Sequence, residues 1–251
     1  MDGPGIIALS GQVALQRQVD TVANNVANMN AAGFRGDRML FQSYISRLNV
    51  PGRQVAFVQD RATYVEATQG PIEATGNPLD LAINGEGYFA VERPGGAGRG
   101  YTRDGRMKIG PDRTLMDNAG RPVLDDAGGR ILVPERATRL EVRADGSIIA
   151  TVDRRAQSVA RLGLSRAQEP RAVRKAGDGL YDIPEGQAQP VDPMSRATRL
   201  VQGSLESSNV QPVTEIANLS DLQRAYDRMQ RIASDDDQRL RRMIETLSRS
   251  N

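Results

Sequence analysis

Two amphipathic helical patterns, one at each end of the chain, constrain its fold more than any other feature. Near the N-terminus, apolar residues recur at spacings of four and three, at Leu15, Val19, Val22, Val26 and Met29. Near the C-terminus the same spacing recurs, broken by Asp236, at Leu219, Leu222, Tyr226, Met229, Ala233, Leu240, Met243 and Leu247. An apolar residue every 3.5 positions on average forms the seam of a supercoiled helix pair. The pattern predicts that the two ends pair with each other or with neighbouring copies.

Boundary signals place these helices in the chain. The first is expected from about Ile6 to Met29, and Gly33 behind it suits the left-handed turn that ends a helix. The second is expected from Pro212 towards Ser248, because proline is favoured in a first helical turn. Its polar face carries acids four residues before arginines, which stabilises an exposed helix, in Asp227/Arg231, Asp235/Arg239, Asp237/Arg241 and Glu245/Arg249.

The middle of the chain has the pattern of short β-strands. Leu79, Leu81 and Ile83 alternate with small or polar residues, and Tyr88-Phe89-Ala90-Val91 follows the turn at Gly85-Glu86-Gly87. Turn sequences recur downstream at Asp104-Gly105, Asp117–Gly120, Asp126–Gly129 and Asp145-Gly146. Strands at this spacing, without helical crossovers, indicate an antiparallel all-β region.

The stretch between the first helix and these strands is mixed. Phe41, Tyr44, Ile45 and Leu48 are compatible with a further helical stretch before Pro51-Gly52 interrupts it. The predicted fold class is therefore mixed α and all-β, with a discontinuous coiled-coil-like pair of N- and C-terminal helices flanking a central antiparallel β-domain. The predicted division is a terminal helical domain from residues 1–35 and 200–251, a connector at 36–75 and an all-β domain at 76–199.

Composition excludes several classes of enzyme. The chain of 251 residues has no cysteine and no histidine, which excludes a thiolate nucleophile, an imidazole base, a Ser-His triad and a Cys/His zinc site. The best remaining candidates for an enzyme are the carboxylates of Asp235, Asp236 and Asp237. On a helix, consecutive side chains point about 100° apart, so these three cannot converge on one ligand. We expect no catalytic activity, cofactor or metal.

Charge and hydropathy argue against nucleic-acid and membrane partners. The 33 basic residues nearly balance 31 acidic ones, for a net charge of +2, and the basic residues, almost all arginine, form no block. No run approaches the ~20 apolar residues of a membrane span. The first ten residues lack the basic start of a secretory signal. These patterns predict a cytosolic protein or one exported without a cleaved signal peptide.

Three asparagines in the first helix are unusual, because asparagine is a mediocre helix former. Asn24, Asn25 and Asn28 share one helical face, about 120° around from the apolar seam. Two interpretations remain open. The face is either a solvated polar stripe or a lateral surface whose amides bind a neighbouring subunit.

Three stretches resemble the family of flagellar rod and hook proteins, and they span nearly the whole chain. Residues 22–35 (VANNVANMNAAGFR) are similar to the family signature ANNxANxxTxGFK, with Ala31-Ala32 where the family more often has Thr. Residues 79–89 (LDLAINGEGYF) and 101–105 (YTRDG) resemble the entry to the family's central β-domain. Residues 202–213 (QGSLESSNVQPV), followed by Glu215 and 222–226 (LQRAY), resemble the family's closing helix.

The resemblance implies a structural subunit of the bacterial flagellar basal body that polymerises helically. The Met-Asp start, the Ser-Asn-Val-x-Pro-Val run and the short connector resemble proximal rod proteins; a distal rod protein or a hook-type subunit is the alternative. The implied partners are other copies, neighbouring rod proteins and the flagellar export apparatus, and the implied location is the periplasmic rod. The implied axial assembly interface consists of the seam residues above together with Asn24, Asn25, Asn28, Gly33, Phe34, Asn209 and Val210.

Overall fold

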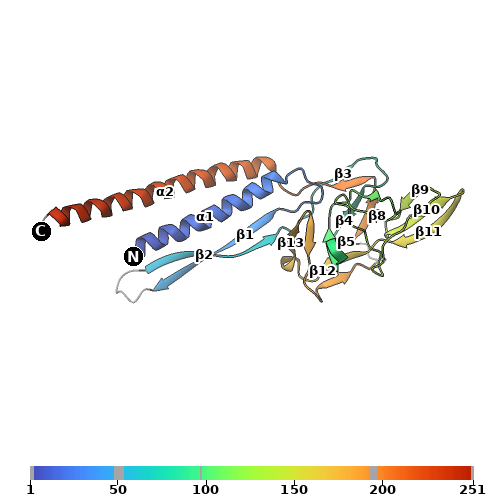
Figure 1. Cartoon of the computed structure of the whole chain (residues 1–251), viewed down its shortest axis with the longest axis horizontal. Coiled ribbons are helices and arrows are strands. Elements are labelled where there is room, and N and C mark those ends of the chain that lie inside the picture. The colour runs from blue at the N-terminus through green and yellow to red at the C-terminus, as the bar shows by residue number, and fades with distance from the viewer. Residues whose placement is uncertain (1–2, 48–53, 97, 193–196, 250–251) are drawn as a thin grey trace. The chain divides into compact units, whose positions relative to one another are not determined.

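The computed structural model of the chain consists of two compact units (Figure 1). The helical unit comprises Met1–Ala27, Asp37–Thr63 and Gln211–Asn251, and the β unit comprises Asn28–Gly36 and Tyr64–Val210. The structure describes residues 3–47, 54–96, 98–192 and 197–249. Within these ranges it leaves out the side chains of residues 3–10, 41–47, 54–62 and most of 232–249.

The helical unit is built on two helices that run side by side in opposite directions, α1 (Gly3–Ala27) and α2 (Pro212–Arg249) (Figure 1). Gln12 Nε2 donates a hydrogen bond to Tyr226 Oη at 3.3 Å across the pair. A Cβ atom at Gly11 would lie 2.7 Å from Met229 Cε, the flexible end of a side chain from α2 that lies against this part of α1. The predicted pairing of the terminal helices is confirmed.

The boundaries of these helices agree closely with the sequence signals. α2 extends from Pro212 to Arg249, one residue beyond the expected end. α1 ends at Ala27, so Met29 lies in the turn that follows and not on the helical seam as predicted. Gly33 has φ +66°, which is the left-handed conformation expected of it.

The further helix over Phe41, Tyr44 and Ile45 is not formed, and that prediction was wrong; Leu48 lies outside the described residues. These residues belong to strand β1 (Asp37–Arg47), which forms a two-stranded sheet with β2 (Gln54–Val65). Aromatic and β-branched side chains favour strands, and this preference outweighs the weak helical spacing.

The β unit contains short strands joined by tight turns, and the strand pairs among its described residues are all antiparallel. Its six-stranded sheet has the order β13-β14-β6-β5-β12-β15, and a three-stranded sheet has the order β11-β10-β9. The pairs β16-β4, β17-β3 and β7-β8 complete the pairing. The strand bounds are β3 Ile72–Ala74, β4 Leu81–Asn84, β5 Tyr88–Glu92, β6 Arg99–Thr102, β7 Lys108–Ile109, β8 Leu115–Met116, β9 Ala137–Val142, β10 Ser147–Val152, β11 Arg155–Arg161, β12 Leu164–Ala167, β13 Arg174–Gly177, β14 Leu180–Asp182, β15 Ala188–Pro190, β16 Arg199–Gln202 and β17 Ser204–Glu206.

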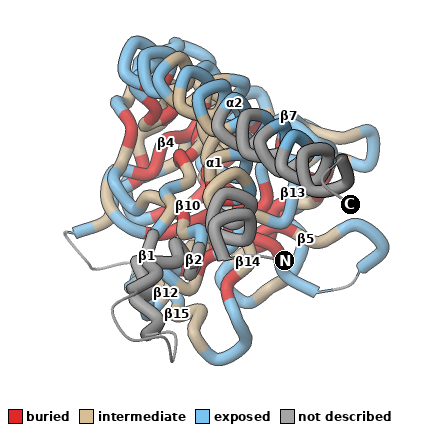
Figure 2. Tube along the Cα trace, turned by 90° about the vertical axis from the view of Figure 1, so that its left-hand side faces the viewer, coloured by how far each residue is buried: buried red, intermediate tan, exposed pale blue. Residues whose placement is uncertain are grey.

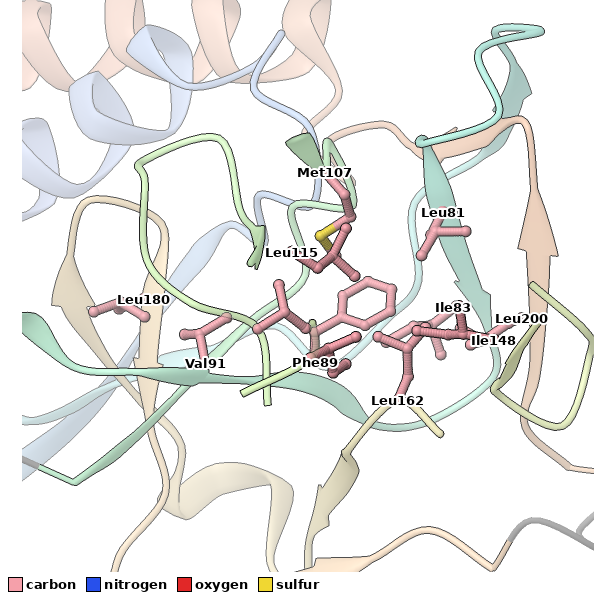
Figure 3. Close-up of a cluster of buried hydrophobic side chains, with 12 residues drawn as sticks. Leu81, Ile83, Phe89, Val91, Met107, Leu115, Ile148, Leu162, Leu180 and Leu200 are labelled. Atoms are coloured by element: carbon pink, nitrogen blue, oxygen red, sulfur yellow. The ribbon is translucent and has the colours of Figure 1, made fainter. Parts of the chain in front are cut away.

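The main hydrophobic core lies inside the β unit (Figure 3). Phe89, Val91 and Val123 are completely buried, and Leu81 and Ile83 from β4 pack into the same cluster. Figure 2 shows buried segments along these strands, while the described part of α2 is largely half-buried or exposed. The β unit therefore buries an apolar core of its own.

The two units divide the chain at other positions than the predicted domains. Residues 28–36 and 200–210, expected in the helical domain, lie in the β unit. Residues 37–63, expected in the connector, lie in the helical unit because β1 and β2 belong to it.

Candidate assembly surfaces

The apolar seam of the helical unit is only half-buried in one copy of the chain. This applies to each described seam residue of α1 and α2, namely Leu15, Val19, Val22, Val26, Leu219, Leu222, Tyr226 and Met229. The side chains of Ala233, Leu240, Met243 and Leu247 lie outside the described residues. Next to the seam, Val13 is 46% exposed, and Val213, at the start of α2, is 83% exposed. A single helix pair therefore leaves much of its apolar surface accessible.

The three asparagines do not share one environment, so the prediction of a common amide face is corrected. Asn24 is exposed, whereas Asn25 is only 1% exposed, and Asn28 lies in the turn beyond the end of α1. The Asn25 side chain accepts a hydrogen bond from Asp37 N at 2.8 Å and donates one to Asp37 O at 3.0 Å. Asn25 therefore holds the start of β1 against α1 within one chain, an interpretation that the sequence did not suggest.

A groove of about 350 Å³ with a mixed polar and apolar lining lies between α1, β1 and α2 in the helical unit. Its lining includes Gln18, Asn25, Asp37, Glu215, Asn218 and Asp221. Glu215, in the first turn of α2, is 2% exposed and accepts a hydrogen bond from Arg38 Nη1 at 2.9 Å through its Oε1 atom. Among the described residues, the buried Oε2 atom of Glu215 has no hydrogen-bond partner.

Gly33 occupies a position that no other residue type fits. Its positive φ disfavours L side chains, and a Cβ atom would lie within 3.0 Å of the backbone of Arg103 and Asp104. Gly33 N donates to Glu206 O at 2.7 Å, and Gly33 O accepts from Tyr181 Oη at 3.1 Å. The candidate residue Gly33 is thus packed inside the β unit.

The remaining candidates around the first and last motifs also make contacts within the β unit. Lys175 Nζ lies 3.8 Å from the centroid of the Phe34 ring, a cation–π arrangement. Asn209 Oδ1 accepts from Gly36 N at 2.8 Å, and Asn209 Nδ2 donates to Thr68 O at 2.8 Å. Val210 is 7% exposed. The first and last motifs, far apart in sequence, therefore meet in one place.

A buried ionic network lies at this meeting point. Arg103 Nη1 donates to Glu206 Oε2 at 2.7 Å, and Arg35 Nη2 lies 3.8 Å from Glu206 Oε1. Arg103 also donates to the carbonyls of Ile83 and Gly85, which anchors the guanidinium to the end of β4. Burying a carboxylate together with two guanidinium groups costs desolvation free energy. Their ion pairs and hydrogen bonds must therefore have good geometry to offset that cost.

Two tyrosines complete the network. The guanidinium carbons of Arg35 and Arg103 lie 5.5 and 5.3 Å from the centroid of the Tyr88 ring, which packs at 5.2 Å against the ring of Tyr181. Burial, above all, raises the pKa of the Tyr181 hydroxyl. Burial also lowers the pKa of Arg103, and the charge of Arg35 adds to this effect while Glu206 opposes it.

The sequence did not single out Arg35, Arg103, Tyr181 and Glu206 as site residues. Arg35, Arg103 and Glu206 lie inside the three family-like stretches, which could have drawn attention to them. Their pairing depends on contacts between distant positions, such as Arg35 and Tyr181, which are 146 positions apart, and one sequence does not reveal such contacts.

There is no cluster of three or more acidic, histidine or cysteine residues that could hold a metal ion within the described ranges. The side chains of Asp235, Asp236 and Asp237 lie outside the described residues. No described helix is long and apolar enough to cross a membrane.

Comparison with protein-family models identifies three separate stretches of the chain. Three protein-family models match it: flagella basal body rod protein over residues 7–35, flagellar hook protein FlgE/F/G D1 domain over residues 82–150, and flagellar basal body rod FlgEFG protein C-terminal over residues 201–246.

Curated relatives match over nearly their full length. The flagellar basal-body rod protein FlgF of Caulobacter vibrioides is 38% identical over 255 residues, covering all of both chains. FlgF of Mesorhizobium japonicum is 35% identical over 240 residues, covering 94% of this chain and 95% of its own. FlgG of Bacillus subtilis is 28% identical over 256 residues, covering 94% of this chain and 96% of its own.

Proposed function

The chain belongs to the flagellar basal-body rod protein family, and from this premise we propose that it builds part of the proximal rod by polymerising through its helical unit. The FlgF relatives, at 35% and 38% identity, are more similar to the chain than the FlgG relative at 28%. This difference supports a FlgF-type subunit, with a FlgG-type distal rod or hook-type subunit as the lesser alternative.

The observation that carries this proposal is the half-buried seam between α1 and α2. In the β unit, core side chains such as Phe89 and Val91 are completely buried, whereas the described seam residues of the helices are not. Long helices with one apolar stripe gain most of their stability from tertiary packing. Neighbouring copies that cover the rest of the seam would supply that packing, and a contact between unlike surfaces produces an open helical polymer when its rotation does not close into a ring.

The role is structural and not enzymatic in this proposal. The partners are other copies of the chain and neighbouring rod proteins, met after delivery by the flagellar export apparatus without a cleaved signal peptide. The subunit then lies in the periplasmic part of the basal body, between the membrane ring and the distal rod.

A pair of seam substitutions tests the role of the helical unit. Leu222→Asp and Val22→Asp place a charge in the seam, which would cost several kcal/mol if a neighbour buries it. In a strain lacking its own copy of the gene, we expect both variants to abolish motility and to leave no completed rods among purified basal bodies. The β unit should melt at an unchanged temperature.

Leu132→Asp is the matched control, because Leu132 is an exposed leucine of the β unit, at 60% exposure. It should retain motility. Normal rods in both seam variants would overturn the proposal. To separate the two rod types, the wild-type chain is expressed in strains lacking either FlgF or FlgG, and restored motility is expected only in the strain that lacks FlgF.

A further inference from the structure

We infer that the Asn84-Gly85 pair is a site of deamidation, which the side chain of Gln69 keeps closed in the folded chain. The reaction converts the side-chain amide of Asn84 to a carboxyl group and needs no enzyme. The inference concerns the chemical durability of the β unit and does not depend on the proposed function.

The sequence supplies the reactive pair, because Asn84 is the only asparagine of the chain that glycine follows. In deamidation, the backbone nitrogen of Gly85 loses its proton and bonds to Cγ of Asn84, while the Cγ–Nδ2 bond breaks and ammonia leaves. Water then opens the cyclic imide and leaves aspartate or isoaspartate at this position. Glycine favours the attack because it has no side chain to hinder the approach of its nitrogen.

The fold requires glycine at position 85 and leaves the neighbouring asparagine open to water. Gly85 has φ +116°, and a Cβ atom there would lie 2.1 Å from Ala197 O. Asn84 is exposed, so water reaches its side chain. A bulkier residue after the asparagine cannot therefore protect the pair, and neither can the exclusion of water. Protection has to come from the conformation of the backbone.

The backbone around Asn84 is held by two partners. Asn84 is the last residue of β4 and pairs with Arg199 of β16. Gln69 Oε1 accepts a hydrogen bond from Gly85 N at 3.0 Å, and Gln69 Nε2 donates one to Ile83 O at 2.7 Å. One side-chain amide thus binds the residues before and after Asn84, as a neighbouring strand would. The proton of the attacking nitrogen is engaged, and the imide ring closes only when the backbone leaves its extended conformation.

Reaction at this site would damage the buried ionic network. Arg103 Nη1 donates to Ile83 O at 3.2 Å, and Arg103 Nη2 donates to Gly85 O at 2.7 Å, while the same guanidinium binds Glu206. Isoaspartate directs the main chain through Cγ, which adds one atom to the backbone and moves Gly85 relative to Arg103. The hydrogen bonds of Gln69 therefore protect the point at which the network is anchored to β4.

Two matched variants of the full chain test the role of Gln69. Gln69→Met keeps the length of the side chain and removes both hydrogen bonds. Gln202→Met is the control, because Gln202 is also half-buried and bonds to backbone groups of the β unit, accepting from Val142 N at 3.2 Å and donating to Pro78 O at 2.7 Å.

The purified chains are incubated at mildly alkaline pH, and mass spectrometry of the peptide that contains Asn84 follows the exchange of its amide for a carboxyl group. The reaction proceeds through a locally opened state, whose population rises when hydrogen bonds are lost. We expect Gln69→Met to react about tenfold faster than the wild type, and Gln202→Met to react at the wild-type rate. Wild type unfolded in urea should react about a hundredfold or more faster than the folded wild type.

Three results would overturn the inference: equal rates in the folded and unfolded wild type, a wild-type rate in Gln69→Met, or the same acceleration in both variants. If Gln69→Met does not fold, hydrogen exchange of the Gly85 amide in the wild type decides the question. An amide that exchanges far more slowly than in the unfolded chain supports the closed site, whereas exchange at the unfolded rate overturns it.

Discussion

Arg103 donates a hydrogen bond to Glu206 across 2.7 Å, and neither side chain is more than 1% exposed. The same carboxylate lies 3.8 Å from a guanidinium nitrogen of Arg35. Glu206 thereby connects the segment after α1, the end of β6 and the last strand of the β unit. The buried guanidinium groups of Arg35 and Arg103 both depend on the negative charge of Glu206 for compensation.

Replacing Glu206 by glutamine should destabilise the β unit severely. The Glu206→Gln change keeps the shape but leaves two buried guanidinium groups without a counter-charge, and breaking a buried pair costs about 3–5 kcal/mol. Urea unfolding at neutral pH measures the loss. Glu92→Gln, which removes the exposed pair with Arg130, should change stability by no more than about 1 kcal/mol. Equal effects of the two variants would contradict a special role for the network.

Gly33→Ala should be far more costly than the same change at Gly76. Both glycines have positive φ, +66° and +75°, so both variants share a backbone penalty of about 1–2 kcal/mol. Only Gly33 has backbone atoms of Arg103 and Asp104 in the way of a Cβ atom, whereas nothing lies within 4 Å at Gly76. We expect a loss of about 4 kcal/mol or more at Gly33, measured by thermal unfolding of matched variants.

Tyr181→Phe should destabilise the chain at neutral pH. It should also make the free energy of unfolding less dependent on pH above about pH 10. The variant loses the donor to Gly33 O and the acceptor for Arg35 N, at about 1–3 kcal/mol. Because burial raises the pKa of Tyr181 in the folded state, its contribution is complete below the unfolded pKa of about 10. The contribution falls as the pH rises above that value, since the unfolded chain then loses the proton first.

The measurement for Tyr181 is a series of urea unfolding curves between neutral pH and strongly alkaline pH. The gap in stability between wild type and Tyr181→Phe should narrow above about pH 10. Tyr226→Phe, in the helical unit, serves as the control for general alkaline effects. A gap that stays constant across the series would argue against a raised pKa in the folded state.

Asn25→Ala should loosen the start of β1, whereas Asn24→Ala should have little effect. Only Asn25 is buried and bonded to both backbone groups of Asp37, and unpaired buried groups cost about 1–3 kcal/mol. Hydrogen exchange of the Asp37 amide should speed up in the Asn25 variant, and motility should fall while export of the subunit continues. Unchanged exchange of that amide would contradict the contact.

The fold could be predicted in outline because its main signals are local. The apolar spacing of Leu219, Leu222 and Tyr226 and the proline at 212 place α2 almost to the residue. Turn sequences such as Asp145-Gly146, between β9 and β10, indicate the short strands. The helical prediction for the β1 segment was wrong because Phe41, Tyr44 and Ile45 fit a weak helical spacing, whereas aromatic residues also favour strands.

The candidate site was predicted only in part, because its key contacts join distant segments. Gly33 was identified from its position behind a helix, but the reason it must be glycine is the backbone of Arg103, which no local pattern indicates. Asn25 was noticed as an unusual helical residue, yet its partner is a backbone group 12 positions away. Whether the seam and motif residues contact neighbouring copies stays a prediction.

The paired segments around Gly33 and Glu206 also have a mechanical consequence. Gly33 N bonds to Glu206 O at 2.7 Å, and Asn209 N bonds to Phe34 O at 3.3 Å, so the segment that follows α1 and the segment that precedes α2 are tied to each other. A twist or pull transmitted along one terminal segment is therefore shared with the other, and the bonds bear the load in parallel. In a subunit of a rotating rod, these two attachments would keep either segment from being pulled out of the β unit on its own.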